Sequence, residues 1–152
     1  MKYDDASWYL ERNPSEEDDD VLQKNAGTHT ALLLKWCCLK GWANPDRFPA
    51  GHEGLQQLIR GGMSARDFLF DCCDGQFDSE ALTTEGNAFL AEYFGPDGDF
   101  MFDYCGTFPD QLLIGTEADH DFSKFSEMVE RRYQAFLAAP AEKAKRPWWK
   151  FW

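Results

Sequence analysis

The strongest constraint on the fold is a nearly unbroken apolar stretch from Ala31 to Leu39, in which Lys35 is the only charged residue. The stretch is far shorter than the roughly 20 apolar residues that a membrane-spanning helix needs. A helix with apolar side chains on nearly all sides is typical of a protein interior. Thr28 can cap its first turn and Gly41 can end it. We therefore expect a chain that folds around one central buried helix and does not cross a membrane.

The composition is that of a single folded domain. The chain has 152 residues, of which 43% are hydrophobic and 16% aromatic. A chain of this length typically buries roughly 70% of the surface that it exposes when unfolded, so it can fold without a disulfide or a metal. The apolar content is too high for a disordered chain. We expect one globular domain over residues 1–140, followed by a basic, Trp-rich C-terminal tail over 141–152.

Capping signals and apolar spacing predict further helices. Ser64 begins a sequence that resembles a capping box, Thr84 can cap another helix, and Pro140 should end the last one. Periodicity does not decide whether residues 100–104 form a helical turn or a strand, and the best strand candidate is Leu112–Ile114. Besides the central helix, helices are expected around residues 55–60, 64–74, 84–94 and 122–137. The predicted class is mainly α: a single compact helical domain with about five helices and at most a small β element.

The charge of the chain is strongly acidic and unevenly distributed. The net charge is −12, and between Arg66 and Lys124 there are fourteen acidic residues and no Lys or Arg. A second acidic run covers residues 16–20, and the sign inverts only in the tail. Such a surface repels phosphate backbones and anionic lipid headgroups, so we expect neither nucleic acid nor a membrane as a partner. The acidic surface either keeps the protein soluble or binds a basic protein.

The sequence contains no recognisable catalytic or metal-binding motif. The five cysteines form two adjacent pairs and one single position: Cys37-Cys38, Cys72-Cys73 and Cys105. Adjacent cysteines lack the spacing of zinc ligands, and the chain has no glycine-rich phosphate loop and no nucleophile elbow. The N-terminus lacks a secretory signal, so we expect a cytoplasmic protein with reduced, buried thiols. We expect no enzymatic activity, no metal site and no cofactor, and we expect His29 at the edge of the core.

Two acidic segments are candidate partner-binding surfaces. The first follows the polar face and the end of the helix expected around 64–74, and the second surrounds a turn near residue 97. The predicted partner-binding residues are Asp71, Asp74, Asp78, Glu80, Asp97, Asp99, Asp103, Tyr104 and Trp8. If the fold brings the two segments together, they form one negative patch with an aromatic edge, a combination suited to an interface. Both Trp8 and Tyr104 can equally be core residues, and the sequence leaves this open.

Several short segments form a recognisable set. They are Tyr3-Asp4-Asp5-Ala6-Ser7-Trp8, Gly27-Thr28-His29, Arg66-Asp67-Phe68, Cys73-Asp74-Gly75, Glu85-Gly86-Asn87-Ala88-Phe89, Asp103-Tyr104 and Arg131-Arg132-Tyr133. With this set, which spans roughly residues 3–137, the chain resembles a domain-of-unknown-function family of small, uncharacterised bacterial proteins that open with Tyr-Asp-Asp-Ala-Ser-Trp. The chain departs from the family pattern at Tyr9-Leu10, where a His would be expected.

The resemblance implies a bacterial cytosolic protein of a kind often encoded near secreted antibacterial toxins, and it implies no catalytic residue. That context suggests an immunity protein of a polymorphic toxin system. Toxins that act on nucleic acids or nucleotides need Lys and Arg to hold phosphate, and an acidic inhibitor can mimic that ligand. We therefore expect a protein that neutralises a cognate protein toxin with a basic active-site cleft. The alternative is a cytosolic protein-binding adaptor or regulator unrelated to toxins.

Overall fold

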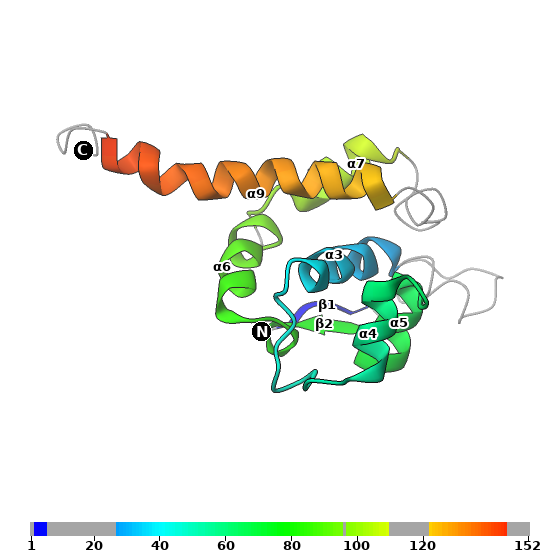
Figure 1. Ribbon diagram of the computed structural model, residues 1–152. Helices are drawn as coiled ribbons and strands as arrows, with labels where there is room; N and C mark the ends of the chain where they lie inside the picture. Colours follow the sequence, from blue (N-terminus) through cyan, green and yellow to red (C-terminus); the bar gives the residue numbers. More distant parts are fainter. Residues whose placement is uncertain (1, 6–26, 96, 110–121, 146–152) are drawn as a thin grey trace.

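The computed structural model describes residues 2–5, 27–95, 97–109 and 122–145, which form six α-helices, a short 3₁₀-helix and two short strands (Figure 1). The elements in chain order are β1 (Lys2–Asp5), α3 (Thr28–Leu39), α4 (Glu53–Arg60), α5 (Ala65–Cys73), β2 (Gln76–Asp78), η1 (Ser79–Ala81), α6 (Thr84–Tyr93), α7 (Phe100–Thr107) and α9 (Phe122–Lys145). The prediction of a mainly α, single compact domain with a small β element is confirmed. No helix of the described ranges has the length and apolar character needed to cross a membrane.

The apolar stretch forms the centre of the fold, as predicted. Ten of the twelve residues of α3 are buried, because the helix is covered by α4 and α5 on one side and by α9 on another. Lys35 is half-buried, and its ammonium group lies 4.3 Å from the centre of the Phe122 ring. Thr28 is the first helical residue and not the cap: the cap position is Gly27, which has no side chain to bond the first turn. The capping prediction was therefore wrong by one residue.

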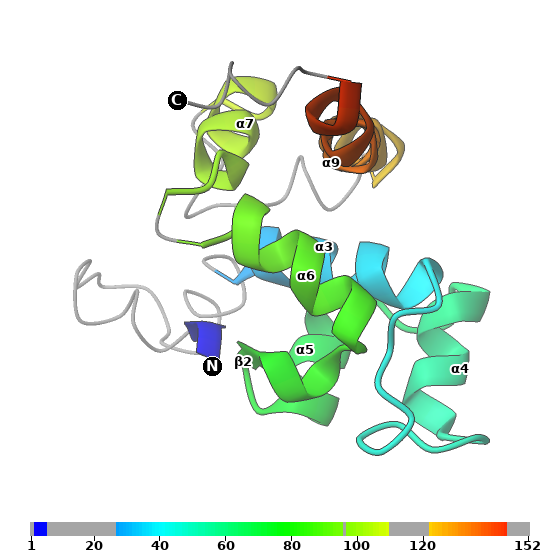
Figure 2. The same cartoon turned by 90° about the vertical axis from the view of Figure 1, so that its left-hand side faces the viewer.

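The elements are arranged in layers around α3. In Figures 1 and 2, α7 and α9 lie above α3 and α6, and the strands, α4 and α5 lie below them. Aromatic rings join the layers: Trp36 on α3 lies 5.9 Å from Phe89 on α6 and 5.8 Å from Tyr133 on α9, between ring centres. Phe89 and Tyr133 are themselves 5.3 Å apart. These contacts explain why so short a domain contains so many aromatic residues.

The two strands form an antiparallel pair that joins the N-terminus to the end of α5. Asp5 pairs with Gln76 and Asp4 with Phe77, and the register is irregular between Lys2 and Asp4. Phe77 is fully buried, and its ring centre lies 5.3 Å from that of Tyr3. The sequence did not identify these strands, since each is too short to show a two-residue alternation. The predicted strand at 112–114 lies outside the described residues.

Several predicted helix ends can be compared with the structure. Ser64 caps α5, with its hydroxyl oxygen accepting a hydrogen bond from the backbone N–H three residues later at 3.1 Å, as predicted. The cap of α6 is Thr83 and not Thr84. Pro140 does not end α9, which continues to Lys145. A proline removes one backbone hydrogen bond, and a helix held by packing along its earlier turns tolerates that local loss. The predicted domain boundary at residue 140 thus falls inside α9.

Candidate functional site

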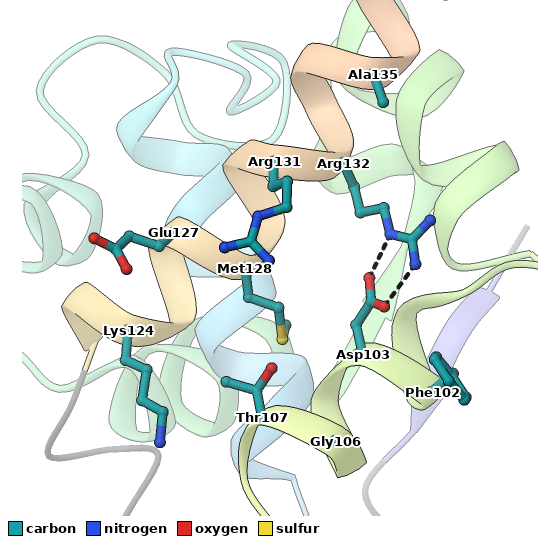
Figure 3. A pocket seen from close by; sticks show the side chains of 10 residues that line it. All are labelled: Phe102, Asp103, Gly106, Thr107, Lys124, Glu127, Met128, Arg131, Arg132 and Ala135. Atoms are coloured by element: carbon teal, nitrogen blue, oxygen red, sulfur yellow. Dashed lines mark hydrogen bonds and ion pairs between the residues drawn. The ribbon is translucent and has the colours of Figure 1, made fainter.

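A groove with a cavity volume of about 520 Å³ lies between α7 and α9 (Figure 3). This volume falls within the roughly 300–1,000 Å³ that is common for ligand sites. Met128 points from α9 toward Thr107 on α7 and is almost fully buried. Gly106 also lines the groove, and Phe102 on the same helix is 79% exposed. The groove therefore combines an apolar floor with an accessible aromatic side chain.

An ion pair crosses this groove, with Phe102 on one side of it and Met128 on the other (Figure 3). The Nε and Nη2 atoms of Arg132 donate hydrogen bonds to the two carboxylate oxygens of Asp103, each at 2.8 Å (Figure 3). Nη1 of Arg132 also donates to Asp99 at 3.3 Å, and the Tyr93 hydroxyl donates to Asp103 at 2.9 Å. Burial raises the pKa of Tyr93, and the hydrogen bond to the carboxylate raises it further. This bidentate pair and the Tyr93 hydrogen bond join α6, α7 and α9, and the single positive charge of Arg132 is shared between the two carboxylates.

Two further basic residues of α9 line the groove on the other side of Met128 from this ion pair (Figure 3). Arg131 is exposed and forms no ion pair or side-chain hydrogen bond with any residue in the described part of the chain. The ammonium group of Lys124 lies 4.9 Å from the centre of the Phe108 ring. Glu127 is the acidic residue nearest to them on α9, and its side chain points away from the ion pair. The groove lining thus carries three basic and two acidic side chains, on a protein with a net charge of −12.

A second polar cluster is buried where β1 meets the first turn of α3. One oxygen of the Asp4 carboxylate lies 3.1 Å from Nε2 of His29 and accepts a hydrogen bond from the Thr30 hydroxyl. The other oxygen accepts a hydrogen bond from the N–H of Asp5 at 2.9 Å. The first turn of a helix favours a carboxylate, so this buried group is stabilised by its position as well as by its partners. His29 is fully buried, deeper than the core edge predicted for it.

The same N-terminal strand is joined to α6. The Tyr3 hydroxyl donates a hydrogen bond to Oδ1 of Asn87 at 2.7 Å, and Nδ2 of Asn87 donates to the carbonyl oxygens of Ser79 and Leu82 at 2.8 and 3.3 Å. The neighbouring Gly86 lies against Trp42, where an added Cβ would be 3.1 Å from the Trp42 Cβ. Asn87 therefore joins β1 and η1 to α6, and Gly86 allows α6 to approach Trp42 closely. Neither residue lines the groove between α7 and α9.

The structure places the first predicted acidic segment at the surface of the lower layer. Asp71 is exposed on α5, and Asp74 is exposed at the end of that helix with a left-handed backbone (φ 55°). Asp78 caps η1 and lies 3.6 Å from Nη1 of Arg47, whereas Glu80 is exposed. Three of these four carboxylates are thus accessible without a basic neighbour among the described residues.

The second predicted segment lies in the upper layer, and only part of it is accessible. Asp97 and Asp99 are exposed, but Asp99 and the half-buried Asp103 are both bound to Arg132. Tyr104 is fully buried, with its ring centre 5.6 Å from that of His29, so the expected aromatic edge of the patch is wrong. The preceding aromatic, Phe102, has the exposure that was expected of Tyr104, because successive residues of a helix point in different directions. Trp8 lies outside the described residues.

The two acidic segments do not come together. Figures 1 and 2 show α7 beside α9 in the upper layer, whereas α5 and β2 lie in the lower layer with α3 between them. A single patch that combines Asp74 with Asp99 is therefore not formed. The sequence indicates which acids are close along the chain, whereas the distance between the two segments depends on tertiary packing.

The cysteines behave mostly as small core residues. Cys37, Cys38 and Cys73 are buried, Cys72 is half-buried, and Cys105 on α7 is exposed. Burial raises the pKa of Cys38 and of Cys73 to about 12, so both thiols stay protonated at neutral pH. Among the described residues no group of three His, Cys, Asp or Glu side chains is placed to hold a metal ion.

The chain is thus a small helical protein with a two-stranded sheet, a polar network that ties its N-terminus to α3 and α6, and a groove between its last two described helices. It belongs to the family of the domain of unknown function DUF7832, whose model matches residues 2–115. The match includes the residues of the polar network on β1, α3 and α6. It ends before α9, so Arg131 and Arg132 lie beyond it. Comparisons with curated proteins and with solved structures gave no match.

The groove was not found from the sequence. The pairing of Asp103 with Arg132 spans 29 residues, far beyond the spacing of charge pairs within one helix. The available signal was the return of basic residues after Lys124, which ends the long acidic stretch at the beginning of α9. That signal shows where basic residues return in the sequence, but it does not show which helix packs against them.

Proposed function

We propose that this chain is an immunity protein that binds a cognate bacterial toxin and blocks its basic active-site cleft. The proposal depends on exposed acidic side chains whose negative charge is not offset by an ion pair within the described residues. Six exposed acids between Arg66 and Lys124 form no ion pair with any residue in the described ranges: Asp71, Asp74, Glu80, Glu85, Glu92 and Asp97. Like charges on one surface repel each other and lower the stability of the folded state, so a basic partner that covers them is favoured.

The most accessible part of this surface is the end of α5 and the following turn, where Asp71, Asp74 and Glu80 lie within ten residues of sequence. Asp99 and Asp103 contribute less, because both already bind Arg132, which offsets one of their two negative charges. A cleft that holds phosphate with Lys and Arg offers the opposite charge, and attraction between the two surfaces accelerates their encounter. The interface is therefore assigned to the α5 side of the molecule.

The test measures association of the purified chain with the toxin domain encoded beside its gene, at low and at physiological salt. Asp71→Lys is expected to slow association severalfold at low salt and to reduce its salt dependence, because charges near an interface act mainly on the association rate. Glu127→Lys is the matched control. It also reverses one exposed mid-helix acid, but in the upper layer on α9, so it should leave the rate nearly unchanged.

Two results would contradict the proposal. The absence of any toxin domain beside the gene, with the chain encoded in a metabolic operon, would favour the adaptor alternative. A rate that falls for Glu127→Lys and not for Asp71→Lys would place the interface on the α9 side of the molecule. Unfolding curves of both variants serve as the check on folding, because exposed charges contribute little to stability.

A further inference from the structure

We infer that the groove between α7 and α9 is a second binding site, which takes a short peptide segment of a partner protein that carries an acidic side chain beside a large apolar one. The groove has the volume of a ligand site, about 520 Å³, and is bounded by two helices that are held together across it by the Asp103–Arg132 pair. Because that pair fixes the separation of the two helices, the groove is a preformed feature.

The charge of the groove selects an acidic ligand. Arg132 uses three of its nitrogens on Asp103 and Asp99, so its guanidinium is already satisfied. Arg131 has no such partner in the described part of the chain, and its planar guanidinium can bind a carboxylate through two parallel hydrogen bonds. The protein as a whole, with a net charge of −12, repels anions, so a carboxylate that binds here must be attracted by Arg131 itself.

The apolar part of the groove selects the neighbouring side chain of the ligand. Met128 forms the floor, and its flexible thioether adapts to ligands of different shape. Phe102 is the most exposed large hydrophobic residue of the described ranges, and covering it would remove apolar surface from water. At Gly106 an added Cβ would meet no atom within 4 Å, so the backbone of α7 is open to an approaching chain.

These features fit a peptide better than an inorganic anion, because a free phosphate would leave Met128 and Phe102 without a partner. They also separate this site from the proposed toxin interface, since a basic cleft would be repelled by Arg131 and is assigned to the α5 side. The inference therefore does not depend on the immunity function.

The test uses fluorescein-labelled hexapeptides and the full chain. Fluorescence anisotropy compares a peptide of alternating Glu and Leu with one in which every Glu is replaced by Lys. The net charge of the protein alone favours the Lys peptide, whereas the groove favours the Glu peptide. Tighter binding of the Glu peptide, with NMR amide shifts confined to α7 and α9, is the expected result.

Three variants locate the site. Arg131→Glu should weaken binding of the Glu peptide about tenfold or more, the usual size of a lost charged hydrogen bond. Gly106→Trp, which fills the groove from its open side, should weaken it similarly, whereas Gly106→Ala should not. Arg60→Glu is the matched control: it reverses an exposed arginine of α4 that also lacks an ion pair with described residues, and binding should be unchanged.

Each opposite outcome overturns the inference. No detectable binding of the Glu peptide, stronger binding of the Lys peptide, or an Arg131→Glu variant that binds like the unmodified chain would show that the groove does not select an acidic segment. Self-association in sedimentation that Gly106→Trp abolishes would identify a second copy of this chain as the occupant instead. Toxin binding, if present, should be unaffected by Gly106→Trp, so the two proposals can fail separately.

Discussion

Replacing Asn87 by alanine is expected to lower the free energy of unfolding by about 2 to 3 kcal/mol. The side chain makes three hydrogen bonds, to Tyr3, Ser79 and Leu82, and each typically contributes about 1 kcal/mol net. Alanine is the better helix former at this position in α6, which returns about 0.5 kcal/mol. The change leaves two carbonyl oxygens and a tyrosine hydroxyl without their Asn87 partner.

The assay is urea denaturation followed by far-ultraviolet circular dichroism. The midpoint should fall while the slope stays unchanged, because the variant exposes the same surface on unfolding. For a domain of this size the loss corresponds to a melting temperature lower by roughly 5–10 °C. Gln56→Ala, which truncates an exposed amide on α4, is the control and should change stability by less than about 0.5 kcal/mol.

A double-mutant cycle isolates the long-range part of this effect. Tyr3→Phe alone should cost about 1 kcal/mol, and the double variant with Asn87→Ala should cost about 1 kcal/mol less than the sum of the two single variants. A cycle without coupling would show that the Tyr3 hydroxyl does not depend on Asn87. An Asn87→Ala loss below about 0.5 kcal/mol would refute the view that this residue joins β1, η1 and α6.

Three further outcomes are expected. Leu33→Ala should cost roughly 2–5 kcal/mol in the same assay because Leu33 is fully buried, and Leu39→Ala, at a position 45% exposed, should cost far less. Native Cys105 should react rapidly with a thiol reagent at pH 8, whereas burial and a pKa near 12 should protect Cys38 until the protein unfolds; equal rates would contradict this. Burial raises the pKa of Tyr93 in the folded state, so the unfolded chain loses this proton first and stability should fall as the pH rises above about 10. Tyr93→Phe should make that fall less steep, and an unchanged slope would show that Tyr93 does not cause it.

Local signals in the sequence were sufficient for the main helices. The apolar stretch predicted α3 because a helix surrounded by neighbours needs apolar residues on every side. Ser64 identified the start of α5, since a cap acts within one turn of its own helix. The helix expected at 122–137 is present as α9, where Phe125 and Val129 are fully buried at helical spacing, whereas Leu137 is 49% exposed. In each case the determining interactions lie within a few residues of one another.

The features that the sequence did not reveal are pairings between distant elements. The strands β1 and β2 are only four and three residues long. Each is a strand because it pairs with the other, and the composition of neither segment predicts this pairing. Tyr104 and Phe102 are both aromatic residues beside acids, yet one is fully buried and the other 79% exposed. Which side of α7 faces the core depends on where α3 and α9 lie, and no local pattern in an eight-residue helix fixes that.

Several of the motif residues form contacts between the N-terminal strand and the helices around it. Tyr3, Asp4, His29 and Asn87 all lie within the residues that match the family, and their side chains bond one another or the backbone. Such residues specify how β1, α3 and α6 meet. The groove has one wall inside the matched range, on α7, and the other beyond it, on α9. Asp103 and Arg132, which join these two walls, both lie in segments of the recognised set, so the contact between α7 and α9 belongs with the contacts that position β1, α3 and α6.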